Sequence, residues 1–274
     1  MQYPQPPKKI LCIHDLSGLG RCSLAVILPV LSAMGHQVIC LPTAVLSTHT
    51  GGFGTPARME SDTFGRDALN HYAEIGVSFD CIYSGYMATP AQATLADQAF
   101  ALWPDACKVV DPAMGDGGRL YGSLDSGIVA AQTRLARQAD LVLPNVTEAH
   151  LILGRPQPDI PCWSEDAARQ LACDMAALCR AVVITGLPMG KFLGCAGAGK
   201  DTFVQKKPFL SRSYPGTGDL FAAVLIGLLL RGNVLSAAAE AAACFVSECI
   251  QNTDPGADPR CGVWFEPLLR KLIF

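Results

Sequence analysis

The sequence predicts an α/β fold in which parallel strands alternate with helices. Short apolar runs recur along the chain, and most of them end in a polar or Gly-containing turn before a helical pattern begins. At the N-terminus, predicted strands at 9–14 and 36–46 flank a predicted helix at 22–34, which is the βαβ unit of a parallel sheet. No linker or internal repeat interrupts this pattern, so we expect one domain spanning residues 1–274.

The later elements follow the same rhythm as far as residue 186. A turn at 15–20 separates the first strand from the first helix, which Gly35 ends. Further helices are predicted at 63–75, 90–103, 124–139 and 164–179, and further strands at 81–84, 108–110, 141–143 and 181–184. Pro90 at a helix start and two acidic residues in the first turn after Ser164 agree with these boundaries.

The rhythm changes after residue 186. Segments 192–195 and 202–204 flank a Gly-rich turn, which predicts a late antiparallel hairpin. An apolar helix then runs to Arg231, and helices at 234–250 and 268–273 close the chain. The loop 48–62 carries three glycines and is the predicted mobile lid.

Composition limits the class of protein. Half of the 274 residues are hydrophobic and 16% are charged, so we expect a large buried core. A net charge of -3 gives no reason to expect nucleic acid or a membrane surface as partner. The start lacks the apolar core of a signal peptide, and the longest apolar run, 220–230, is too short to cross a bilayer. We therefore expect a cytoplasmic protein whose twelve cysteines, which form no CxxC pair, are reduced.

The strongest functional signal is the segment 213–231. The turn from Pro215 to Asp219 contains Gly216 and Gly218 and opens a helix. Glycines let the backbone approach a ligand, and the free N–H groups and dipole of a helix start favour an anion such as phosphate. Asp219 beside that anion is suited to take a proton from a hydroxyl that attacks phosphorus. A simple capping role for Asp219 explains the segment alone equally well.

Polar residues also follow the ends of the predicted strands, where ligands bind in open parallel sheets. They are Asp15, Ser47 to Thr50, Tyr86, Asp111, Asn145 with Glu148, and Thr185. The carboxylates of Asp111, Asp116 and Glu148 are hard oxygen ligands that suit Mg²⁺ bound together with phosphate. The alternative is that Asp111 and Asn145 form Asx turns and Glu148 caps a helix.

Other sequence signals are weaker. Gly194 to Thr202 approaches a P-loop, but Asp201 replaces the required Ser or Thr and a strand follows, so we interpret it as a hairpin tip. The Gly18 turn lacks the last glycine of a dinucleotide fingerprint, although it leaves an NAD-dependent oxidoreductase as an alternative. His14, His36, His71 and His150 show no spacing typical of a site, so turn or surface positions are expected. His49 either contacts ligand or holds its loop.

With these motifs assembled, the chain resembles the ribokinase superfamily, and within it the pyridoxal/pyridoxamine kinases, from Lys9 to about Cys249. The segment 216–219 resembles the superfamily's anion hole and catalytic base, and 111–116, DPAMGD, resembles the family's DPVMGD. Asn145 and Glu148 match its N-x-x-E element, and Thr185-Gly186 match the start of its nucleotide-binding segment. The resemblance implies a three-layer α/β/α sandwich with a mostly parallel central sheet.

The resemblance to kinases of vitamin B6 rests on two further motifs. Residues 47–51 resemble the S-N-H-T-G loop, with Thr48 in place of Asn, and Gly85-Tyr86 resembles the family's G-Y. The implied substrate-binding residues are Asp15, Ser17, Ser47, Thr50 and Tyr86, of which Asp15 stands where many pyridoxal kinases have Ser.

The implied activity is ATP-dependent phosphorylation of the 5′-hydroxymethyl group of pyridoxal, pyridoxamine or pyridoxine. Asp219 is the implied base, the N–H groups of 216–218 the anion hole, and Asp111 and Glu148 the Mg²⁺ ligands. A K⁺ requirement and a homodimer are further expectations. A hydroxymethylpyrimidine (phosphate) kinase is the near alternative, although those that act on both substrates often carry Cys at the position of Asp219. A second alternative is a protein that binds vitamin B6 or a nucleotide without turnover, and the intact Asp219 argues against it.

Overall fold

A computed structural model describes residues 6–59, 63–122, 124, 127–158, 160, 162–210 and 212–273. The strands are β1 (Lys9–Leu19), β2 (Gln37–Thr48), β3 (Arg58–Met59), β4 (Cys81–Ser84), β5 (Cys107–Val110), β6 (Gly115–Asp116), β7 (Arg119–Leu120), β8 (Leu141–Val142), β9 (Val182–Met189), β10 (Phe192–Ala198) and β11 (Phe203–Pro208). The helices are α1 (Leu24–Ala33), α2 (Phe64–Glu74), α3 (Pro90–Leu102), α4 (Ile128–Ala136), α5 (Val146–Ile152), α6 (Glu165–Ala176), α7 (Thr217–Leu230) and α8 (Leu235–Asn252), followed by the 3₁₀ helices η1 (Pro259–Cys261) and η2 (Glu266–Leu272).

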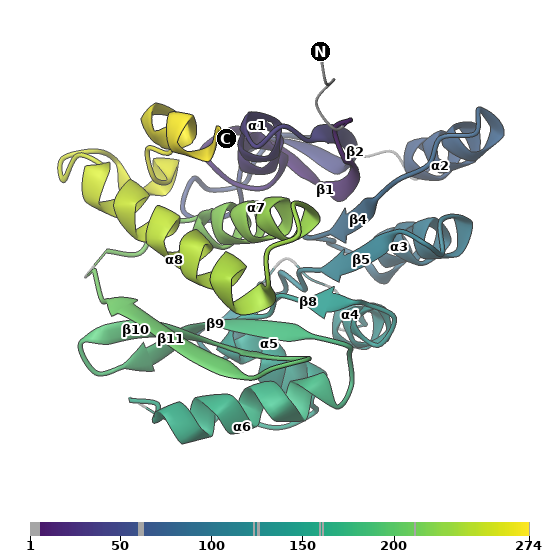
Figure 1. Cartoon of the computed structure of the whole chain (residues 1–274). Coiled ribbons are helices and arrows are strands. Elements are labelled where there is room, and N and C mark those ends of the chain that lie inside the picture. Colours follow the sequence, from purple (N-terminus) through teal and green to yellow (C-terminus); the bar gives the residue numbers. More distant parts are fainter. Residues whose placement is uncertain are drawn as a thin grey trace, which may run out of the picture.

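The centre of the fold is a nine-stranded sheet with the order β11-β10-β9-β8-β5-β4-β1-β2-β3 (Figure 1). Neighbouring strands from β9 to β2 are parallel. β10 and β11 add antiparallel pairs at one edge, and β3 adds one at the other. The predicted parallel sheet with a late antiparallel hairpin is therefore confirmed.

Apolar side chains on both faces of the sheet produce the three layers. In β1, Leu11 and Ile13 belong to a core with helices α2 to α6, whereas Ile10 and Cys12 belong to a core with α1, α7 and α8. Successive side chains of a strand point to opposite faces, so this continuous apolar run requires helices on both sides. Figure 1 shows α1, α7 and α8 together on one side of the sheet.

Several predicted boundaries are wrong. The expected turn at 15–20 is instead the end of β1, which continues to Leu19 because it keeps pairing with β2. β9 likewise continues past Thr185-Gly186 to Met189, where it turns into β10. Helix α5 was expected only in the alternative in which Glu148 caps a helix, and its extent was not predicted, since seven residues are too few for a clear helical period. Within the predicted lid, Arg58–Met59 form β3, and residues 60–62 lie outside the described part of the chain.

Helix α7 is the most deeply packed helix of its layer. Every residue from Leu220 to Leu228 is buried, and Gly227 leaves room for Met34 of α1, which a Cβ would approach to 2.5 Å. This packing holds the N-terminus of α7 at the carboxyl ends of the parallel strands. None of the helices in the described residues has the length and apolarity that crossing a membrane requires. All twelve cysteines are free thiols, and Cys162, Cys173 and Cys244 are exposed.

Candidate active site

The turn before α7 has a backbone conformation that only glycine adopts readily. Gly216 has φ 77° and ψ 0°, and a Cβ there would lie 1.7 Å from the carbonyl oxygen of Arg21. At Gly218, by contrast, a Cβ would have no heavy atom within 4 Å. No side chain caps this helix, and the hydroxyl of Thr217 donates instead to the carbonyl of Tyr214 at 3.1 Å. First-turn N–H groups have no intrahelical partner, so they are available to an anion.

Asp219 lies in that first turn and is held by contacts from the N-terminal segment. Its Oδ2 accepts the backbone N–H of Ser23 at 2.8 Å, and its Oδ1 lies 3.3 Å from Nε2 of His14. The side chain keeps 15% of its surface exposed. A carboxylate with this exposure and two protein contacts retains lone pairs for a substrate hydroxyl.

Asp111 and Glu148 form a pair of carboxylates near Asp219. Burial raises the pKa of Asp111, and the negative charge of Asp219 raises it further. Burial also raises the pKa of Glu148, with a further contribution from Asp111, although backbone N–H groups oppose this shift. The hydroxyl of Tyr83 donates to Asp111 Oδ2 at 3.3 Å.

The capping alternative for Glu148 is also present. Asn145 and Glu148 form a capping box at the start of α5, in which Glu148 Oε2 accepts the N–H of Asn145 at 2.8 Å. Glu148 Oε1 accepts the N–H of Met114 at 2.9 Å, and the amide of Asn145 donates to the carbonyl of Gly115 at 2.7 Å. These bonds attach the segment 111–116 to α5. Asn145 and Glu148 therefore have a structural role and also lie among the candidate site residues.

One cavity of about 170 Å³ joins these groups. Its lining residues include Asp111, Tyr121, Asn145, Glu148, Thr185, Gly216, Gly218 and Asp219. As far as the chain is described, three carboxylates and no Lys or Arg line it. Burying three carboxylates without a cation is costly, so the donor set fits a divalent cation.

The cation would need further oxygen ligands. Among the described residues, no group of three or more His, Cys, Asp or Glu side chains is arranged to hold a metal. Magnesium usually takes one or two carboxylates and completes its shell with water and phosphate oxygens. Because both oxygens of Glu148 already accept backbone N–H bonds, Asp111 is the more available direct ligand.

Some predicted residues lie outside this lining, as far as it is described. Asp116 is exposed, and its carboxylate accepts the N–H of Gly117 at 2.8 Å. Gly186 is exposed within β9 and has φ 73°. Ser47 accepts the N–H of Ala57 at 2.9 Å, which closes the loop, and Thr50 is exposed at its tip.

Asp15 and Ser17 are joined to Asp219 through other residues. Asp15 is 4% exposed, and its carboxylate accepts the hydroxyls of Ser17 at 3.0 Å and of Ser23 at 2.6 Å. Ser23 also donates its N–H to Asp219, so Ser23 links the predicted substrate-binding residue Asp15 to the predicted base Asp219.

Of the four histidines expected at turn or surface positions, His71 is exposed, and His36 follows the turn at the end of α1 but is buried. The expectation is wrong for His14 in β1 and His150 in α5. His14, His36 and His150 are buried, and His14 contacts both Asp15 and Asp219. Sequence reasoning missed His14 because it looked for spacing between histidines. The available signal was its place beside Asp15 at the end of a strand. His49 holds its loop, since its Nε2 donates to the carbonyl of Arg260 at 2.6 Å and its Nδ1 accepts the N–H of Gly51 at 3.0 Å.

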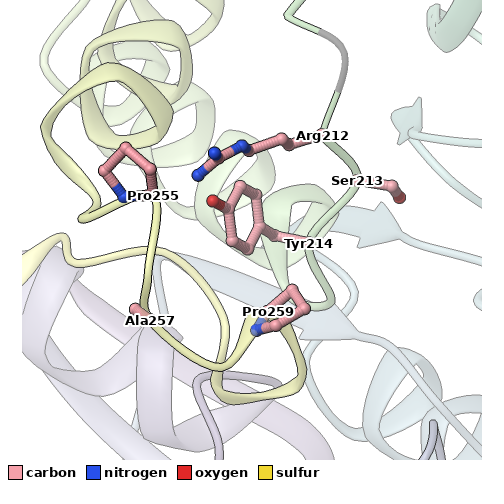
Figure 2. A pocket seen from close by; sticks show the side chains of 6 residues that line it. All are labelled: Arg212, Ser213, Tyr214, Pro255, Ala257 and Pro259. Atoms are coloured by element: carbon pink, nitrogen blue, oxygen red, sulfur yellow. The ribbon is translucent and has the colours of Figure 1, made fainter.

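A larger cavity of about 360 Å³ lies against the segment that precedes Gly216. Arg212, Ser213, Tyr214, Pro255, Ala257 and Pro259 line it (Figure 2). Figure 2 shows the side chains of Arg212 and Tyr214 directed toward the segment that contains Pro255. None of the described residues that line this larger cavity carries a carboxylate, whereas three carboxylates line the smaller cavity.

Comparison with known proteins agrees with this geometry. The family model for phosphomethylpyrimidine kinase matches residues 28–261. A Bacteroides thetaiotaomicron protein crystallised with pyridoxal is 33% identical, with a TM-score of 0.91 over 98% of this chain and 96% of that one. Pyridoxal kinase from Lactobacillus plantarum is 33% identical, with a TM-score of 0.88 over 97% and 96%. The pyridoxine/pyridoxal/pyridoxamine kinase of Bordetella bronchiseptica is 27% identical over 271 residues, 90% of each chain.

Proposed function

Because the chain belongs to the phosphomethylpyrimidine kinase family, we propose that it transfers the γ-phosphoryl group of ATP to the 5′-hydroxymethyl group of a vitamin B6 vitamer. The protein is a kinase with the ribokinase-like fold, and its relatives are kinases of pyridoxal, pyridoxine and pyridoxamine. The observation that carries the proposal is the meeting of Asp219, the Gly216 turn and two further carboxylates in one cavity. The Bacteroides relative with bound pyridoxal supports the choice of substrate.

In this mechanism Asp219 takes the proton of the substrate hydroxyl. The hydroxyl oxygen forms a bond to the γ-phosphorus, and the bond from that phosphorus to the β–γ bridging oxygen breaks, so ADP leaves with the electron pair. The N–H groups of residues 216–218 stabilise the charge on the transferring group. The N–H of Ser23 keeps the Asp219 carboxylate oriented while this happens.

Asp111 would be the direct ligand of Mg²⁺ in this cavity, and Glu148, which lines the same cavity, would add negative charge near the ion. When bound there, the ion supplies positive charge to the phosphate oxygens. Tyr83 orients Asp111 through its hydroxyl, and Asn145 with Glu148 holds the segment that follows Asp111.

A substrate panel tests the proposed function. We expect release of ADP from Mg·ATP when pyridoxal, pyridoxamine or pyridoxine is supplied to the purified protein. If only hydroxymethylpyrimidine is turned over, the substrate is the pyrimidine and not a B6 vitamer, while the proposed mechanism of phosphoryl transfer stands. Absence of turnover with all four compounds, with ATP still bound, would contradict the proposal.

We also propose that the loop from Thr48 to Met59 is part of a lid over the substrate. Arg260 fastens it to η1: its guanidinium donates to the carbonyl of Gly52 at 3.3 Å and lies 4.8 Å from the ring centroid of Phe53. Its own carbonyl accepts the bond from His49. A lid held in this way would keep water from the phosphate.

Arg260→Ala is therefore expected to raise KM for the B6 vitamer several-fold and to increase ATP hydrolysis in its absence. Steady-state kinetics with and without the vitamer measure both effects. Arg270→Ala is the matched control, because Arg270 is an exposed arginine of the same C-terminal segment. Equal kinetics for the two variants would contradict the lid proposal.

The K⁺ requirement, the homodimer and the cytoplasmic location stay predictions.

A further inference from the structure

A buried histidine outside the cavity lining, His14, contacts the proposed base. His14 is 2% exposed and lies between two carboxylates. Its Nδ1 is 2.9 Å from Asp15 Oδ1, and its Nε2 is 3.3 Å from Asp219 Oδ1. The imidazole therefore connects the proposed base to a second, buried carboxylate.

The surrounding chain makes room for this ring. Gly85 follows β4 directly, and a Cβ there would lie 1.8 Å from Cδ2 of His14. Ser23, which has φ 57°, binds Asp219 with its N–H and Asp15 with its hydroxyl. A non-glycine residue in the left-handed region stores strain, which is typical of functional sites. Gly85 after β4 and Ser23 before α1 thus hold the arrangement of Asp15, His14 and Asp219.

The two carboxylates favour a positively charged ring. Burial lowers the pKa of His14, but hydrogen bonds with Asp15 and Asp219 and their charges outweigh it and raise the pKa to about 10. The N–H groups of Asp15 and Tyr86 also lie within 3.0 Å and 3.3 Å of the ring nitrogens. Each ring nitrogen therefore has a carboxylate and a backbone N–H group near it. The charge-assisted bonds from a protonated ring to the carboxylates are stronger than the bonds that a neutral ring would accept from the N–H groups.

The other titratable groups around His14 come from four elements. Tyr83 on β4 packs edge-on, with ring centroids 6.3 Å apart, and Asp111 after β5 interacts with His14 through its charge. Cys22, before α1, interacts with the charges of Asp15 and Asp219, and burial raises its pKa well above the ordinary value. Asp219 on α7 completes the set. Among these neighbours, His14 supplies the positive charge.

We propose that His14 is a positioning residue for Asp219, which it binds through one ring nitrogen while Asp15 anchors the other. It fixes the direction of the Asp219 carboxylate and keeps a positive charge beside it. The inference rests on the proposed kinase function, and it extends the role of the site to a residue outside the cavity lining.

The test compares the full-length protein with His14→Gln, which removes the charge and keeps a polar side chain. We expect kcat to fall about ten- to a hundredfold, as loss of a charge-assisted bond predicts. KM for ATP should change little, because His14 contacts the proposed base and lies outside the cavity lining. His36→Gln is the control, because His36 is a buried histidine that bonds to Gly227 on α7.

A wild-type kcat for His14→Gln would overturn the inference, as would a loss confined to KM. Inactivity of the wild-type protein toward every vitamer would instead overturn the proposed function. If His14→Gln does not fold, ¹⁵N NMR of the wild-type imidazoles decides the matter. The ring of His14 should stay protonated at about pH 8 and lose its proton at lower pH in Asp15→Asn. A neutral ring in the wild-type protein would overturn the inference.

Discussion

Asp219→Asn is expected to lower kcat by about a hundredfold to ten-thousandfold, the usual contribution of a general base. Asparagine keeps the shape of the side chain and an oxygen to accept the N–H of Ser23, so the turn before α7 should survive. What is lost is the ability to take a proton. The dissociation constant for Mg·ATP, measured by calorimetry, should therefore change far less than kcat.

Asp201→Asn is the control for this variant. Asp201 is an exposed carboxylate in the connection between β10 and β11, and the same substitution there should leave the rate unchanged. That result would also agree with a hairpin tip rather than a P-loop at 194–202. An equal loss of kcat and ATP binding in Asp219→Asn would contradict the role of Asp219 as base.

Gly216→Ala is expected to damage both stability and activity. The new Cβ would lie 1.7 Å from the carbonyl oxygen of Arg21, and an alanine with φ 77° is strained whatever the space. The N–H groups of the first turn would move away from the transferring phosphoryl group, and losing such donors costs about a hundredfold to a thousandfold in kcat. Thermal unfolding and steady-state kinetics should show the two losses together.

Gly218→Ala separates these effects. A Cβ at Gly218 meets no heavy atom within 4 Å, and alanine is the better helix former by about 1 kcal/mol. The midpoint of thermal unfolding should therefore stay equal or rise. Any loss of activity would then come from the new Cβ obstructing the ligand and not from lost stability. A Gly216→Ala variant as stable and active as the wild-type protein would contradict the assignment of the anion hole.

The sequence predicted the parts of the site that neighbouring residues determine. The Gly216 turn and the helix start need only adjacent residues, because φ values and free N–H groups are local properties. A helix cap by Glu148 was the alternative to a metal-binding role, and the structure contains it as a capping box with Asn145 at the start of α5. The extent of α5 was not predicted, since its seven residues carry little periodic signal.

Contacts between residues far apart in the chain could not be predicted from the sequence. Ser23 and Asp219 are 196 positions apart, and Arg260 bonds to a carbonyl 208 positions away. β1 continued to Leu19 because β2 offered it a partner, although its own residues predicted a turn.

By itself the sequence determined the α/β class, through its apolar periodicity, and the turn before α7, through its glycines. Only the tertiary structure decided that His14 lies between Asp15 and Asp219 and that η1 holds the loop with Phe53. The reason is physical. Local patterns specify backbone conformation, whereas the meeting of charged groups depends on the strand order and on which strand ends the packed helices bring together.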